Sequence, residues 1–200
     1  MFQIPKSLLG WTVVTLLAIA APASAQDTSD TNSYGSEESG THGEMSPGGR
    51  SPATQVRTVS ELSARLSKMK TMCSAARNYV ADCLAERLET LSQDAAALHG
   101  HRELKQILRE TAEELRLLVR ENSDRNAPRA GIRSPDGQRS ARPLVAVPSS
   151  RLPSVHRQAI AIIEEAETQL LRSSTQSAAR ASQYQQVAEA LGSNKVLLRS

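Results

Sequence analysis

The residues best suited to chemistry in this 200-residue sequence are its two cysteines, Cys73 and Cys83, in the stretch CSAARNYVADC. Nine residues separate them, a spacing compatible with a redox centre, half of a zinc site, a bond between two chains or an intrachain disulfide. Redox centres usually have a C-x-x-C spacing, and a zinc site needs two further ligands. The pair favours an intrachain disulfide, and the other three interpretations stay open.

A disulfide between Cys73 and Cys83 requires the chain to turn between them. One continuous helix would hold them about 15 Å apart, whereas bonded cysteines have Cα atoms roughly 4.4–6.8 Å apart. The apolar stripe that begins at Val59 also slips by one residue relative to the stripe that begins at Leu84. That slip is about 100° around a helix. We therefore expect a helix break between the cysteines, with Asn78 as the N-cap of the second helix.

The only histidine cluster is His99-Gly100-His101, with Glu103 nearby. Two imidazoles at this spacing can reach one metal ion. A glycine between them is typical of a surface turn that ends a helix. The sequence thus offers His99 and His101 only as weak metal candidates, and it predicts no cofactor.

The carboxylates do not form a recognisable acid–base pair. The two glutamate groups, at 110–114 and 164–167, are interspersed with arginines or small residues, as on a solvated helix face. The sequence contains no G-x-S-x-G elbow, P-loop or G-x-G-x-x-G motif. After residue 25 its aromatics are Tyr34, Tyr79 and Tyr184, and ligand pockets usually recruit more. We predict no catalytic residues and no enzymatic activity.

Residues 1–25 match a cleaved secretory signal peptide. Lys6 gives a positive start, Ser7–Ala21 is an apolar run, and Ala23-Ser24-Ala25 suits a signal peptidase. The apolar run is shorter than the roughly 20 residues that span a membrane. We expect cleavage near Ala25, a periplasmic or secreted protein and no transmembrane span. Removing Lys6 lowers the formal net charge from +3 to +2, too little for a nucleic-acid partner.

The rest of the chain divides by composition. Residues 26–56 are acidic and rich in Ser and Gly, which predicts a disordered arm. Residues 57–121 show helical apolar periodicity, starting from a capping box at Thr58-Val59-Ser60-Glu61. Short turns between these helices predict an antiparallel helical hairpin or bundle.

Residues 122–153 contain five prolines and six arginines against two aspartates. This composition predicts an extended basic linker. Its arginines could contact anionic envelope components or only keep the segment hydrated, and the apolar island Leu144–Val147 could dock on the folded part.

Residues 154–192 have the pattern of one long C-terminal helix, capped by Ser154 and followed by a tail at 193–200. Such a helix would be about 55 Å long and would outreach the others. We expect it to protrude or to pair with another chain as in a coiled coil. The anchors of that partner-helix face would be Ile163, Leu170, Tyr184 and Leu191.

The segments CSAARNYVADCLAERLETL and AIIEEAETQLLRSS resemble uncharacterised exported helical bacterial proteins of similar layout, to which no function is attached. The resemblance supports the domain plan alone. The sequence as a whole predicts an exported, non-enzymatic, all-α protein that acts through helix–helix association with a protein partner or with itself. The alternative is a periplasmic chaperone or inhibitor that holds clients on an apolar helical surface. Small periplasmic stress chaperones are similar in being exported and all-α, but their L-T-x-x-Q signature is absent here.

Overall fold

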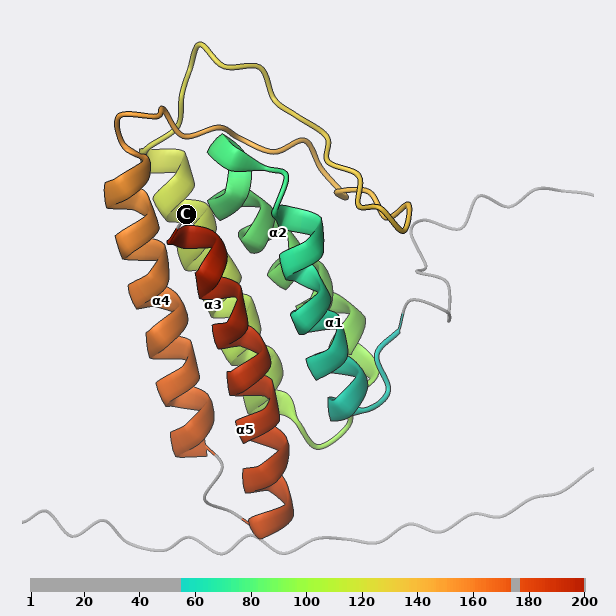
Figure 1. Cartoon of the computed structure of the whole chain (residues 1–200). Helices are drawn as coiled ribbons and strands as arrows, with labels where there is room; N and C mark the ends of the chain where they lie inside the picture. Colours follow the sequence, from blue (N-terminus) through green and yellow to red (C-terminus); the bar gives the residue numbers. More distant parts are fainter. Residues whose placement is uncertain (1–54, 174–176, 200) are drawn as a thin grey trace, which may run out of the picture. The chain divides into compact units, whose positions relative to one another are not determined.

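The computed structural model describes residues 55–173 and 177–199, and α-helices dominate them (Figure 1). The helices are α1 (Val59–Cys73), α2 (Val80–Asp94), α3 (Arg102–Glu121), α4 (Leu152–Ser173) and α5 (Ala178–Gly192). Short 3-10 segments follow three of them, at Arg77–Tyr79 (η2), Ala95–Ala97 (η3) and Ser193–Leu198 (η5). The predicted all-α class is confirmed for this part of the chain. The predicted signal peptide, and nearly all of the predicted disordered arm, lie outside the described residues.

The five helices form a ring in chain order. Each helix packs against the next, and α5 closes the ring by packing against α1 (Figure 1). The packing between α1 and α2 is the thinnest of the five. The bundle has one contiguous core, to which every helix contributes. Its largest fully buried side chains are mostly leucines, together with Tyr184 and Ile163.

The start of α1 follows its sequence signal. The Thr58 hydroxyl accepts a hydrogen bond from the Glu61 backbone N–H at 3.1 Å, which caps the helix. The Glu61 carboxylate accepts from the backbone N–H of Arg57 at 3.2 Å, one residue earlier than a standard capping box requires. This hydrogen bond, followed by contact with Arg65, lowers the pKa of Glu61.

The predicted break between the cysteines is present. Helix α1 ends at Cys73 and α2 begins at Val80, so the chain reverses between them. Cys73 and Cys83 form a disulfide with their Cα atoms 5.7 Å apart. The expected cap at Asn78 is absent, because the 3-10 turn η2 leads directly into α2 and Tyr79 takes the N-cap position without a capping hydrogen bond from its side chain.

The prediction of one long helix over 154–192 was wrong. Helix α4 ends at Ser173, and α5 starts afresh after Ser177, whose hydroxyl accepts a hydrogen bond from the Arg180 N–H at 3.2 Å. Serines such as Ser173 and Ser177 compete for backbone hydrogen bonds and favour helix ends over helix interiors. The two helices pack side by side and share one core, which a protruding helix would forgo.

The prediction of an extended linker over 122–153 was also wrong. This segment folds into a narrow hairpin across one end of the bundle, with bridges between Ala130 and Leu144 and between Arg133 and Arg139 (Figure 1). Leu144 and Val147 are buried, so the apolar island does dock on the core. Helix α4 begins at Leu152, two residues before the expected cap.

No helix within 55–173 and 177–199 combines the length and apolar character needed to cross a membrane.

Candidate functional site

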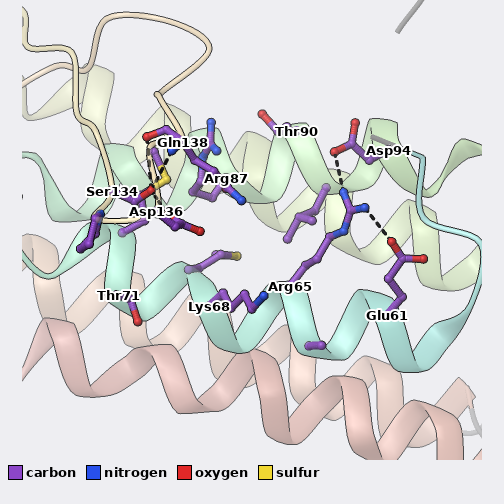
Figure 2. A pocket seen from close by; sticks show the side chains of 15 residues that line it. Glu61, Arg65, Lys68, Thr71, Arg87, Thr90, Asp94, Ser134, Asp136 and Gln138 are labelled. Atoms are coloured by element: carbon purple, nitrogen blue, oxygen red, sulfur yellow. Dashed lines mark hydrogen bonds and ion pairs between the residues drawn. The ribbon is translucent and has the colours of Figure 1, made fainter. Parts of the chain in front are cut away.

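A groove of about 810 Å³ lies between α1 and α2 (Figure 2). We call it the α1–α2 groove. Met69, Met72 and Leu91 line it with apolar atoms. Its polar lining comes from α1, α2 and the tip of the hairpin: Glu61, Arg65, Lys68, Thr71, Arg87, Thr90, Asp94, Ser134, Asp136 and Gln138.

The helices that form the groove are tied together at both ends. The Cys73–Cys83 disulfide joins the last residue of α1 to the first turn of α2. At the opposite end, the Val56 N–H donates to the Asp94 carbonyl at 2.8 Å, which holds the chain before α1 against the end of α2. These ties fix the spacing of two helices that otherwise pack thinly.

An ion-pair bridge crosses the groove at its open end. The Arg65 guanidinium reaches Glu61 on its own helix at 2.6 Å and Asp94 on α2 at 3.5 Å (Figure 2). The side chain of Asp94 is buried, so this arginine neutralises a carboxylate that has lost most of its water. The bridge stiffens the groove and places positive and negative charge on the same wall.

The hairpin tip covers the other end of the groove with a tight turn, Ser134-Pro135-Asp136-Gly137. Proline presets the second position of such a turn, and Gly137 takes φ +85°, which other residues rarely adopt. The Ser134 N–H donates to the Gln138 carbonyl at 2.8 Å, and the Gly137 N–H to the Ser134 carbonyl at 3.0 Å. The Ser134 hydroxyl donates to Asp136 and lowers the pKa of that carboxyl, helped by the nearby Lys68.

Helix α2 fastens the hairpin with two buried carboxylates. Asp82 accepts two hydrogen bonds from the Arg142 guanidinium, both at 2.7 Å, and a third from the Val145 N–H at 2.7 Å. The Asp82 contact raises the pKa of Arg142. One turn later, Glu86 accepts from the Ala141 N–H at 2.8 Å and contacts Arg87. Residues 82 and 86 share one helix face, so this face of α2 holds the hairpin through hydrogen bonds.

The geometry of the α1–α2 groove suits the binding of a ligand. Among the described residues, no group of three His, Cys, Asp or Glu side chains is placed to hold a metal ion.

No protein family, curated protein or solved structure matches this chain. The assignment of function therefore rests on the geometry: an open trough with an apolar lining and a rim that carries both signs of charge.

The two predicted histidine candidates have different surroundings. His99 is exposed, while the ring of His101 lies against Tyr184 with centroids 5.9 Å apart. Burial lowers the pKa of His101, and the positive charges of Arg180 and Lys105 lower it further. His101 is therefore held in its neutral form beside a core tyrosine.

The predicted partner-helix face lies inside the protein. Ile163, Leu170, Tyr184 and Leu191 are all buried within the chain itself, so they hold α4 and α5 in the bundle. The predicted face assumes one long exposed helix. Because α5 folds back beside α4, the same apolar pattern serves the internal core.

The groove and the anchor of the hairpin were missed because each is built from segments that are far apart in the sequence. Asp82 and Arg142 are separated by 60 positions, and no local pattern joins them. A usable signal did exist in Ser-Pro-Asp-Gly at 134–137, a sequence that marks a tight turn. It predicts a chain reversal within the segment interpreted as a linker.

Proposed function

We propose that this is an exported, non-enzymatic interaction protein that binds an extended polypeptide segment of a partner protein in the α1–α2 groove. The signal-like residues 1–25 support export, and a disulfide is typical of oxidising compartments outside the cytosol. The observation that carries the proposal is the groove itself, kept open between two helices that are tied at both ends.

The dimensions and lining of the groove favour a peptide. Its volume of about 810 Å³ lies within the 300–1,000 Å³ usual for ligand sites. Met69 and Met72, which are 3% and 4% exposed, form the floor of the groove with flexible, polarizable side chains that adapt to different apolar partners. Thr71, Thr90 and Gln138 line the same trough and can pair with the backbone N–H and C=O groups of a bound strand.

The charges along the rim also favour a peptide over a small acid or base. Arg65 is balanced by Glu61 and Asp94, and Lys68 lies near Asp136. A trough with alternating charge attracts a segment that carries both signs, and such patterns give orientation and selectivity more than affinity.

Two modes of binding that the sequence suggests, helix–helix pairing and client holding, are not favoured. Pairing through a long C-terminal helix would need its anchors exposed, and they are buried. A client-holding surface would need a contiguous apolar patch. The exposed large apolar residues among those described are Leu117, Leu171 and Val196, which belong to three different elements.

Selection of peptides from a random library on the purified full chain tests the proposal. Ala64 lines the groove and is exposed, so Ala64→Trp fills the trough from α1 without removing a core side chain. Ala161 on α4 is also exposed and lies outside the groove lining, so Ala161→Trp is the matched control.

We expect selected peptides to bind the wild type and the Ala161→Trp variant equally and the Ala64→Trp variant at least tenfold more weakly. A selection that enriches no binder, or binders that Ala64→Trp leaves unaffected, would contradict the proposal.

A further inference from the structure

The segment between α3 and α4 carries five exposed arginines, spread along the two arms and the base of the hairpin. Together we call them the arginine surface: Arg125, Arg129, Arg133, Arg139 and Arg151. All five side chains are exposed. None forms an ion pair with any residue in the described ranges. The sixth arginine of the segment, Arg142, forms an ion pair with the buried Asp82.

Two of these arginines are placed directly against each other. Arg133 and Arg139 form an antiparallel bridge, so their side chains start from opposite positions on the two arms of the hairpin. Cross-strand neighbours have Cβ atoms roughly 4.5–5.5 Å apart, and like charges at such positions destabilise the pair. A pair of this kind becomes favourable when an anion lies between the two guanidinium groups.

The backbone that carries the pair is already ordered. The Ser140 N–H donates to the Ile132 carbonyl at 2.9 Å, and the Arg87 guanidinium donates to the Arg139 carbonyl at 3.3 Å. The buried carboxylates Asp82 and Glu86 hold the same arm. Little backbone entropy therefore remains to be lost when the arginines bind a ligand, and the remaining cost lies in their side chains.

A second basic group lies at the base of the hairpin. Arg120, Arg125 and Arg151 line a hollow of about 390 Å³ where α3 ends and α4 begins. Its acids are Glu121 and Asp124, and the Asp124 carboxylate accepts a hydrogen bond from the Asn126 N–H. Four residues of extended chain, as from Arg129 to Arg133, cover roughly 13 Å. A single phosphate therefore cannot contact all of the arginine surface. A ligand that carries many phosphates can contact all of it.

We propose that the arginine surface docks the protein on a membrane that contains anionic phospholipids, with Arg133 and Arg139 sharing one lipid phosphate. The planar fork of arginine matches phosphate oxygens in two directions. Exposed basic residues near an anionic bilayer strengthen attachment by about fivefold each. Anionic phospholipids are among the envelope components that an exported protein meets. This proposal rests on the proposed export and does not depend on peptide binding in the groove.

Co-sedimentation of the full chain with vesicles tests the proposal. The vesicles contain 30% phosphatidylglycerol in phosphatidylcholine, and pure phosphatidylcholine vesicles provide the reference. The variant is Arg133→Gln/Arg139→Gln. The matched control is Arg102→Gln/Arg172→Gln, which removes the same charge from exposed positions where α3 begins and α4 ends. Thermal unfolding of each variant shows that it is folded.

We expect the wild type to bind anionic vesicles only, and less strongly as salt rises. The Arg133→Gln/Arg139→Gln variant should bind at least tenfold more weakly, while the control should change less than twofold. Equal losses in both variants would show that net charge alone matters and would overturn the site. Tighter binding to inorganic polyphosphate than to the vesicles would overturn the lipid assignment.

A conservative variant tests the shared phosphate separately. Arg133→Lys/Arg139→Lys keeps the charge and removes the fork, so we expect binding about threefold weaker than the wild type. Binding as tight as the wild type would show that the two residues do not share one phosphate.

Discussion

Asp82 on α2 and Arg142 on the hairpin form a two-point ion pair, with both N···O distances at 2.7 Å. Asp82 is 2% exposed, so its charge has little water and depends on this partner. The pair joins the helical bundle to the segment that covers one end of the groove and carries the arginine surface. Both proposed binding surfaces therefore depend on it.

Replacing Arg142 leaves the Asp82 charge buried without its main partner. We expect Arg142→Gln to lower the free energy of unfolding by about 3 kcal/mol, the usual effect of breaking a buried pair from one side. Asp82→Asn/Arg142→Gln should recover part of that loss, since no charge stays buried. Urea unfolding measures both.

The exposed pair Arg109–Glu113, at 3.7 Å, provides the control for this prediction. Arg109→Gln should change stability by less than about 0.5 kcal/mol. If Arg142→Gln is equally mild, the ion pair does not hold the hairpin.

The disulfide stabilises the α1–α2 corner. Closing a ring of about 11 residues contributes roughly 3 kcal/mol by the loop-entropy relation. Cys73→Ser/Cys83→Ser should lower the free energy of unfolding by that amount and loosen the groove. Thiol titration of the unfolded, unreduced protein should find no free thiol, and finding two would show that the bond is absent.

Buried His156 makes stability depend on pH. Burial lowers its pKa from the ordinary 6.5, against a smaller opposing effect of the Leu198 backbone. The unfolded chain thus binds a proton more readily than the folded one. The stability from neutral His156 is complete above pH 6.5 and is lost as pH falls toward the lowered folded pKa.

We therefore expect the urea midpoint of the wild type to fall between about pH 7.5 and pH 5.5, and to fall less in His156→Gln. Exposed His99 supplies the control, because His99→Gln should leave the pH dependence unchanged. An equal fall in the wild type and in His156→Gln would refute this role of His156.

The turn at the hairpin tip depends on Gly137. Its φ of +85° strains any residue that has a Cβ, although the space around it is open. Gly137→Ala should lower stability by about 1 kcal/mol. Gly131→Ala, where the space is also open and φ is not positive, should change it by less than about 0.5 kcal/mol in thermal unfolding. Equal effects would show that the turn is not constrained there.

Local signals in the sequence predicted local structure well. The cap at Thr58 and the apolar stripes that begin at Val59 and Leu84 each depend on residues a few positions apart. The structure contains the cap, the helix break and the disulfide. Periodicity alone could not separate α4 from α5, because an apolar face that thins at Ser173 and Ser177 fits one long helix as well as two.

The groove and the hairpin anchor could not be predicted from local patterns. In the sequence, Arg142 is indistinguishable from the five other arginines of its segment. Only the fold shows that it forms an ion pair with Asp82. The same holds for Asp94, whose partner Arg65 lies on another helix. Contacts of this kind form only when distant segments of the chain fold together. Composition alone therefore predicted an extended linker over 122–153, where the chain forms an ordered hairpin.

Amide chemical-shift mapping of the full chain with a selected peptide tests the central claim most directly. Peptide binding in the α1–α2 groove predicts shifts on α1, on α2 and at the hairpin tip 134–138, and their loss in Ala64→Trp. Shifts confined to α4 and α5, or unchanged by Ala64→Trp, would contradict the account.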